Sequence, residues 1–394
     1  MAQCCNRSAG LHNPTVGRII RGMNADVTNA LHYGIVGAGR VAQEHVKGAL
    51  AAGGRIAAVH DAQVYKAEEL AAFIANQGAQ APPRIARTLD ELLAMDDVGC
   101  VVVAVPNVAH CDIATACLNA GKDVLLEKPM AMNLAECDAI LAAMESNGRI
   151  VQLGFVCRGS PKVHAVRDIL EAGTLGTVYH VKASAYRQRG IPGLGGWFTN
   201  RAMSGGGVLV DIGVHLIDLV MHLTKAQRAR TVSGVCEARF GSPMDQYVYE
   251  EMWAGPPRLD GVCDVEDSAM GLIRFDNGMS CEMNLAWASN LPQQLLPDGI
   301  ALLGDRGGLF FDLWGERLTL VTQQEGKVVE RELPTDASDL WDRAWRWQHE
   351  QFTAAVQSRT APGASAAQGR AVQEIIAAWQ RSGEMQREVA VSAE

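Results

Sequence analysis

The chain has 394 residues, of which 48% are hydrophobic and 20% charged, a balance typical of globular enzymes and not of disordered proteins. Its formal net charge of −9 provides no basic surface, so we expect neither nucleic acid nor an anionic membrane as a partner. No apolar run reaches the roughly 18 residues of a membrane span. The length exceeds what one hydrophobic core usually supports, which predicts two domains.

Residues 1–30 show neither a regular period nor the apolar segment of a secretory signal. We interpret them as a flexible leader or as an arm that reaches a second subunit. Of the ten cysteines, eight are scattered through apolar segments between Cys100 and Cys281, and none forms a CxxC pair. This pattern predicts free buried thiols, no metal site and a cytoplasmic location.

From residue 31 the pattern alternates between two kinds of segment. Strand-like runs lie at 32–36, 55–60, 99–105, 122–126 and 149–155, and helix-like runs lie between them at 41–50, 66–76 and 110–120. Alternation of this kind, with nearly continuous valine and isoleucine in the strands, is typical of a parallel sheet covered on both faces. We therefore predict a doubly wound Rossmann domain over 31–154.

After about residue 155 the strands become longer and often alternate apolar with polar residues. Asp276-Asn277-Gly278 separates two of them and is a hairpin signal. Helical segments at 340–358 and 366–381 close the chain. We predict that 155–394 form an α+β domain with a large, mainly antiparallel open sheet, for substrate binding and oligomerisation. The fold class is α/β overall.

The first strand is followed by Gly37-x-Gly39-x-x-Ala42. Gly37 permits a tight turn, and Gly39 lets the backbone approach a pyrophosphate at the N-terminus of the next helix. Asp61 ends the second strand, where an acid can accept from the 2′-hydroxyl of adenosine and repel a 2′-phosphate. We therefore favour NAD over NADP, although Asp61 could also be an ordinary turn residue.

The stretch "VLLEKPMA" (124–131) places an acid and a base directly after a buried strand. Charges against an apolar core are costly unless they are used, and the carboxyl edge of a parallel sheet is where ligands bind. We expect Glu127 to accept from ribose hydroxyls and Lys128 to reach the substrate, aimed by Pro129 through a bond that can be cis. The full set predicted to border the cofactor is Gly37, Gly39, Arg40, Val41, Asp61, Pro106, Asn107, His110, Glu127 and Lys128. For His110, a plain helix-start role is the alternative.

A second constellation lies in "GGGVLVDIGVHLIDL" (205–219), where Asp211 and His215 are four residues apart and would share one face of a helix. His215 can take the proton of an alcohol at neutral pH. Asp211 can hold the imidazole or bind a neighbouring hydroxyl, and Lys128 can polarise the carbonyl that forms.

Together with "GIVGAGRVA" and "NAGKDVLLEKPMA", these motifs make residues 31 to about 385 resemble the glucose–fructose oxidoreductase/inositol dehydrogenase/rhizopine-catabolism (Gfo/Idh/MocA) superfamily. The resemblance implies that Lys128, Asp211 and His215 line the catalytic pocket. The family often shows Gly-Phe-Asn-x-Arg where this chain has "GFVCR" (154–158). Arg158 matches and is a substrate candidate, whereas Val156 replaces the polar residue.

The loop from Tyr186 to Arg201 leads directly to the second constellation. Its arginines Arg187 and Arg189 can donate to hydroxyls, and Trp197 offers a flat face on which a sugar can stack. The alternative is a surface loop with buried aromatic residues.

We therefore predict an NAD-dependent oxidoreductase acting on a secondary hydroxyl of a sugar, glycoside or cyclic polyol. Two alternatives remain open, an NAD-dependent glycosidase that uses transient oxidation and elimination, and a non-catalytic NAD or sugar sensor. Strands such as 271–287 carry apolar residues on both faces, more than one buried face requires. We therefore expect a homodimer or homotetramer formed through the C-terminal sheet, unless helices of the same chain cover that face.

Overall fold

The computed structural model describes residues 30–391, apart from 79–80, 227, 251, 253, 297 and 337. The prediction for the leader therefore lies outside the described residues, Ala30 excepted, and so do the other two cysteines, Cys4 and Cys5. The eight described cysteines carry free thiols, and five of them are buried, which confirms the prediction for those five, while Cys111, Cys236 and Cys263 are partly buried.

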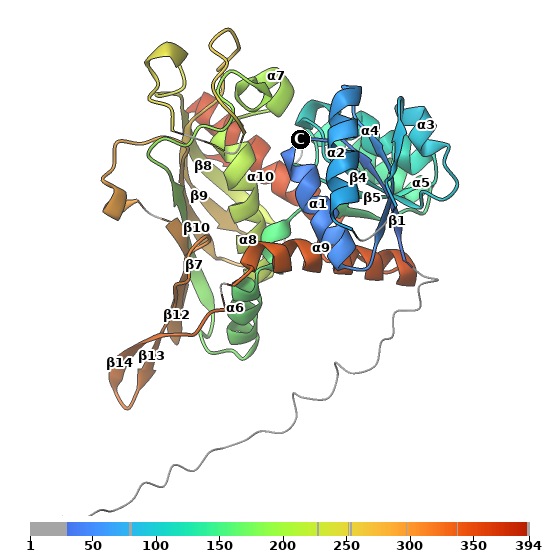
Figure 1. The fold of residues 1–394 in the computed structure, drawn as a ribbon. Coiled ribbons are helices and arrows are strands. Elements are labelled where there is room, and N and C mark those ends of the chain that lie inside the picture. Colours follow the sequence, from blue (N-terminus) through green and yellow to red (C-terminus); the bar gives the residue numbers. More distant parts are fainter. Residues whose placement is uncertain are drawn as a thin grey trace, which may run out of the picture. The chain divides into compact units, whose positions relative to one another are not determined.

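The first sheet has six strands in the order β3-β2-β1-β4-β5-β6, and all of its pairs are parallel (Figure 1). Its strands are β1 (His32–Val36), β2 (Arg55–His60), β3 (Arg84–Ala86), β4 (Cys100–Val103), β5 (Asp123–Leu126) and β6 (Val151–Leu153). The helices between them are α1 (Arg40–Ala51), α2 (Val64–Asn76), α3 (Leu89–Leu93), α4 (His110–Asn119) and α5 (Leu134–Ser146). β4 and β5 are buried along their whole length, as the continuous apolar runs predicted.

The second sheet has nine strands in the order β14-β13-β12-β11-β7-β10-β9-β8-β15. They are β7 (Val178–Tyr186), β8 (Ala229–Glu237), β9 (Ser268–Phe275), β10 (Ser280–Ala286), β11 (Asp298–Gly304), β12 (Gly307–Phe311), β13 (Leu318–Gln324), β14 (Lys327–Glu332) and β15 (Val389–Ala390). Only β7 and β10 pair in parallel, so the sheet is mixed but mainly antiparallel, as predicted. Gly278 adopts φ +85° in the β9–β10 hairpin, a conformation that favours glycine.

Helices cover the inner face of this sheet, where Val181, Cys281 and Met283 are fully buried. They include α8 (Val214–Thr224), which contacts β7, and α10 (Ala366–Met385), which contacts β8. The helix α6 (Pro161–Glu171) packs on α8, and α7 (Arg201–Ser204) lies in the segment that leads to α8. On the outer face, Lys182 and Glu282 form a half-exposed ion pair, and Met270 is 38% exposed. Because this face carries charges as well as apolar side chains, its role in oligomerisation stays a prediction.

The helix α9 (Leu340–Ser358) belongs by sequence to the second domain but packs on the first. Its Phe352 and Ala355 are buried in the same apolar cluster as Tyr33 and Val46, and α9 lies against α1 (Figure 1). The helix α9 therefore completes the core of the first domain, which composition alone does not indicate.

Among the described residues, one helical stretch, Arg201–Thr224, has the length and apolar composition to cross a membrane, and 83% of its most apolar window is buried inside the protein. The sequence contains no continuous apolar run of this length here, because Asp211 and His215 interrupt the apolar residues. A buried core helix can have the same length and apolar composition, so this stretch is weak evidence for a membrane span.

Candidate active site

The turn between β1 and α1 has the geometry of a phosphate cradle. Gly37 adopts φ +93°, and a Cβ there would lie 2.2 Å from the carbonyl oxygen of Ala104, so no other residue fits without movement. Gly39 is the N-cap of α1, and a Cβ added at this residue would meet no atom within 4 Å. This open space at the N-terminus of a helix suits an anion, because the N–H groups of the first turn have no partners within the helix.

Asp61 supports this turn. Its Oδ2 accepts from the backbone N–H of Ala38 at 2.8 Å, and its Oδ1 accepts from that of Gln63 at 2.8 Å. The turn role and the predicted ribose role are compatible, because each carboxylate oxygen has a second lone pair and Asp61 borders the adjoining cavity.

A cavity of about 770 Å³ extends from the turn to the helix α8. Most residues predicted from the sequence line it, namely Gly37, Gly39, Arg40, Val41, Asp61, Pro106, Asn107, Glu127, Lys128, Arg187, Trp197, Asp211 and His215. The cavity has the size of a ligand site and holds both the dinucleotide motif and the candidate acid–base groups. The residues present therefore fit a nicotinamide dinucleotide.

Lys128 follows β5, and its bond to Pro129 is cis. Its Nζ donates to Oδ1 of Asp211 at 3.0 Å and to the carbonyl of the same residue at 3.0 Å. Oδ2 of Asp211 accepts from Nε1 of Trp287 at 3.2 Å. Burial acts to raise the pKa of Asp211, but Lys128 and Arg187 outweigh it and hold that pKa below its usual value. Asp211 thus orients Lys128. The sequence alone indicated the imidazole of His215 or a neighbouring hydroxyl as the partner of Asp211.

The segment that carries Asp211 departs from the predicted α-helix. Leu209–Gly213 form a π-helical turn, and α8 begins only at Val214. Such turns are rare and often lie at functional sites. The wider turn changes the relative direction of Asp211 and His215 from the one that α-helical spacing predicts, and both side chains still line the cavity.

His215 lies in the first turn of α8, with its Nδ1 3.7 Å from Sγ of Cys157. Burial and the charge of Lys128 lower the pKa of His215 to about 3, while Asp211 and Glu127 act in the opposite direction. The imidazole is therefore neutral at pH 7 and can accept a proton.

Behind Lys128 lies a buried polar chain that the sequence analysis missed. Oε1 of Glu127 contacts Nε2 of His45 at 2.9 Å, and Nδ1 of His45 contacts Nε2 of His349 at 3.2 Å. Burial acts to raise the pKa of Glu127, but the hydrogen bond from His45 and the nearby charges hold it below its usual value. The sequence signal that could have revealed this polar chain is a histidine on the buried face of each of two helices, His45 on α1 and His349 on α9.

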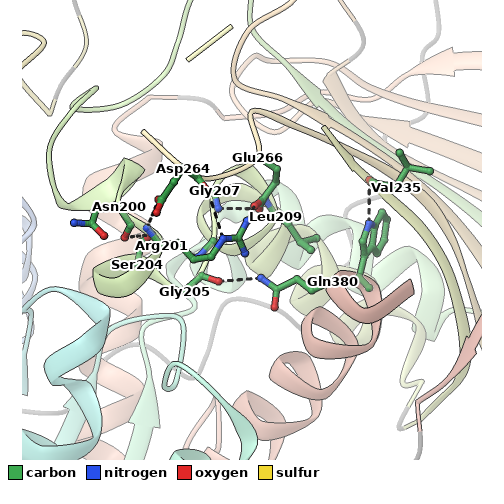
Figure 2. A network of polar contacts seen from close by, with 12 residues as sticks. Asn200, Arg201, Ser204, Gly205, Gly207, Leu209, Val235, Asp264, Glu266 and Gln380 are labelled. Atoms are coloured by element: carbon green, nitrogen blue, oxygen red, sulfur yellow. Dashed lines mark hydrogen bonds and ion pairs between the residues drawn. The ribbon is translucent and has the colours of Figure 1, made fainter. Parts of the chain in front are cut away.

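Glu266, only 3% exposed, fixes the start of the π turn (Figure 2). Its Oε1 accepts from the N–H groups of Gly207 at 2.8 Å and Leu209 at 3.3 Å, and Oε2 lies 3.4 Å from Arg201. A Cβ at Gly207 would come within 1.9 Å of the Glu266 carbonyl oxygen. Glycine at this position lets the segment that directly precedes β9 approach the turn that carries Asp211.

His110 is fully buried and does not border the cavity. Its ring nitrogens lie 2.8 Å from the carbonyl of Pro129 and 3.0 Å from that of Val105. It joins the two strand-end turns, so the helix-start alternative describes it better than the predicted cofactor contact.

Two arginines predicted to bind substrate do not line the cavity either. Arg158 is 2% exposed, and its Nε donates to Asp218 at 2.9 Å. Arg189 donates to the carbonyl of Ser289 at 2.9 Å and lies over the ring of Phe240. Both are held by partners of their own, which corrects the prediction. In the described part of the chain, no group of three or more His, Cys, Asp or Glu residues is placed to hold a metal ion.

Comparison with known families agrees with this geometry. Residues 31–155 match the model described as "Oxidoreductase family, NAD-binding Rossmann fold", and residues 163–310 match the "GFO/IDH/MocA C-terminal domain". The chain belongs to the Gfo/Idh/MocA oxidoreductase family. The family assignment covers both halves of the cavity and makes the first domain an NAD-binding one.

Individual relatives of this family member cover nearly its whole length. D-glucoside 3-dehydrogenase of Escherichia coli (strain K12) is 28% identical over 92% of this chain and 97% of its own. The structure of GenD2 from gentamicin A biosynthesis in complex with NAD is 25% identical, with a TM-score of 0.74 over 96% of this chain and all of that one. Levoglucosan dehydrogenase in complex with NADH and levoglucosan is 21% identical, with a TM-score of 0.77 over 92% of this chain and all of that one, a likeness of fold.

Proposed function

We propose that this protein is an NAD-dependent dehydrogenase that oxidises a secondary hydroxyl of a sugar, glycoside or cyclic polyol. The observation that carries the proposal is that Lys128, paired with Asp211, lines the same cavity as His215 and the Gly37 turn. A cation, a neutral imidazole and a phosphate cradle in one cavity are what alcohol oxidation by a dinucleotide requires.

The roles follow from charge and position. His215 accepts the hydroxyl proton, and Lys128 stabilises the negative charge that develops on the same oxygen. Asp211 keeps the ammonium aimed at the reacting oxygen through the hydrogen bond at 3.0 Å. NAD, when bound, supplies the hydride acceptor. In the reverse direction His215 returns the proton and Lys128 polarises the carbonyl.

On the substrate side, Arg187 and Trp197 line the cavity. Arg187 can donate to neighbouring hydroxyls, and the flat ring of Trp197 suits the apolar face of a pyranose or an inositol. Asp61 favours NAD over NADP, because its carboxylate can accept from the 2′-hydroxyl of adenosine and repels a 2′-phosphate.

A substrate panel tests the proposal. The purified protein would be incubated with NAD and with sugars, inositols and glycosides, and followed by NADH absorbance and product mass. We expect NADH formation with at least one of these compounds and a product two hydrogens lighter. Release of an aglycone without net NADH would instead support the glycosidase alternative, and the absence of turnover with every compound would support a sensor.

We also propose that the protein works in the cytoplasm as a homodimer or homotetramer joined through the outer face of the second sheet. Half-exposed Met270 and Val235 on that face are the supporting observation. Light scattering tests the assembly, since a mass of 42.2 kDa, that of one chain, would contradict it.

A further inference from the structure

Two aromatic pairs line the candidate active-site cavity. The rings of Trp197 and Phe198 stack with centroids 3.8 Å apart. Those of Trp314 and Trp341 stack at 5.2 Å with an interplanar angle of 30°. The second pair comes from the β12–β13 connection and the start of α9, and the proposed function has not used it.

The second pair lies on the Glu127 side of the cavity. Trp345, one helical turn after Trp341, lines the cavity and packs edge-on against His45, with ring centroids 4.8 Å apart. His45 in turn contacts Glu127 at 2.9 Å. This aromatic wall is therefore connected to the residue that directly precedes Lys128.

The first pair is connected to the end of the neighbouring strand β4. Trp197 leads through α7 to Ser204, whose carbonyl accepts from the amide of Asn107 at 2.8 Å. Asn107 follows β4, whereas Glu127 follows β5. The two pairs are thus connected to the ends of neighbouring strands, β4 and β5, and both pairs line the cavity that holds Lys128.

Trp314 is held in place by a buried cation. Lys162 is 3% exposed, and its Nζ donates to the carbonyls of Asp312 at 2.8 Å and Gly315 at 2.6 Å. It also pairs with the carboxylate of Asp312. A buried ammonium is costly without such partners, so the connection that carries Trp314 is fixed on both sides of the tryptophan.

Trp314 nevertheless remains 47% exposed, and it is one of the residues that line the cavity. A large flat ring that is held in position but uncovered marks a ligand surface, because covering it removes apolar area from water. We propose that Trp314 and Trp341 form a second stacking platform. The substrate is then a glycoside whose neighbouring ring, an aglycone or a second sugar, lies on Trp314. This inference rests on the proposed function and narrows its substrate class.

The test compares phenyl and methyl glycosides of the same hexopyranoses, so that only the neighbouring ring differs. We expect the wild type to prefer the phenyl glycoside by about tenfold in kcat/KM. Trp314→Ala should remove most of this preference and leave the methyl glycoside within about twofold, whereas Trp314→Phe should keep most of it. Tyr179→Ala is the control, since Tyr179 is 54% exposed on β7 and does not line the cavity.

Binding of the same phenyl glycosides to the NAD-loaded protein, read by tryptophan fluorescence, tests the platform without turnover. Weaker binding in Trp314→Ala, in protein whose circular dichroism matches the wild type, supports the inference even if no compound of the panel is oxidised. If Trp314→Ala does not fold, Trp314→Leu replaces it, because leucine is apolar but not flat. Equal kcat/KM for both glycosides, equal losses on both, or a higher KM for NAD alone would overturn the platform and leave the dehydrogenase proposal standing.

Discussion

The ammonium of Lys128 and the carboxylate of Asp211 lie 3.0 Å apart, although 83 residues separate them in the chain. The first follows β5 of the parallel sheet, and the second lies in the π turn before α8 of the other domain. Their side chains are only 17% and 12% exposed, so each charge depends on the other for its stability. The pair joins the two domains at the point where chemistry is proposed, and it directs the predictions that follow.

Replacing either Lys128 or His215 should strongly lower turnover but keep NAD binding. Lys128→Met and His215→Ala are each expected to lower kcat by about 10²–10⁴-fold, the usual contribution of such groups. Binding of NAD, measured by fluorescence titration, should remain within a few-fold because neither side chain holds the adenine half. Lys182→Ala, in the half-exposed ion pair on the outer face of the sheet, is the matched control and should keep wild-type activity. Near wild-type turnover in His215→Ala would show that another group is the base.

The pH dependence of kcat/KM should lack an acid limb near neutrality. His215 must be neutral to act, and its pKa in the free protein is lowered from 6.5 to about 3, so it stays neutral as the pH falls. We expect kcat/KM to change less than about twofold between about pH 8 and pH 5.5, where an unshifted histidine would lose about tenfold. Lys128 is one cause of the lowered pKa, so the residual activity of Lys128→Met should acquire an acid limb at higher pH. A wild-type midpoint near the ordinary histidine pKa would contradict this assignment.

Asp61 should decide between the two dinucleotides. Asp61→Asn removes the charge but keeps an oxygen for one of the two backbone N–H groups, whereas Asp61→Ala also releases the turn at Ala38. Both changes should raise the ratio of kcat/KM with NADP to that with NAD, by about 10-fold or more, because a charged acceptor of the 2′-hydroxyl is lost. Only Asp61→Ala should also weaken both cofactors. The prediction fails if the wild type already prefers NADP.

Glu266 should act on the reaction through the π turn. Glu266→Ala leaves the buried N–H groups of Gly207 and Leu209 without an acceptor, at a cost of about 1–3 kcal/mol for each in the free energy of unfolding. Movement of Asp211 should then lower kcat by about 10- to 100-fold with little change in the KM for NAD. Glu266→Gln keeps the acceptor and should restore most of kcat.

Urea unfolding and initial rates measure these effects together. Arg201→Ala is the control, because the Arg201 side chain is 47% exposed and its contact with Glu266 is long, at 3.4 Å. A loss of stability in Glu266→Ala without any change in kcat would assign Glu266 to the fold alone.

Much of this protein could be predicted from local pattern. The strands of the first domain, the Gly37 turn and the acid after β2 depend on periodicity, on backbone conformation and on spacing, all of which are local properties. The charged pair after β5 could be assigned to a ligand edge for the same reason, since parallel strands end together. These features predict that Asp61, Lys128 and His215 border one ligand site, and all three line the same cavity.

What the tertiary structure decided depends on contacts between residues far apart in the chain. Arg158, Arg189 and His110 are residue types that suit ligand binding, but buried partners from other elements hold them away from the cavity. Conversely, the contact between His45 and His349 and the Trp314–Trp341 pair arise because α9 returns to pack on the first domain. Local sequence cannot reveal such pairings, because a side chain's partner is set by how helices and sheets pack and not by its neighbours along the chain.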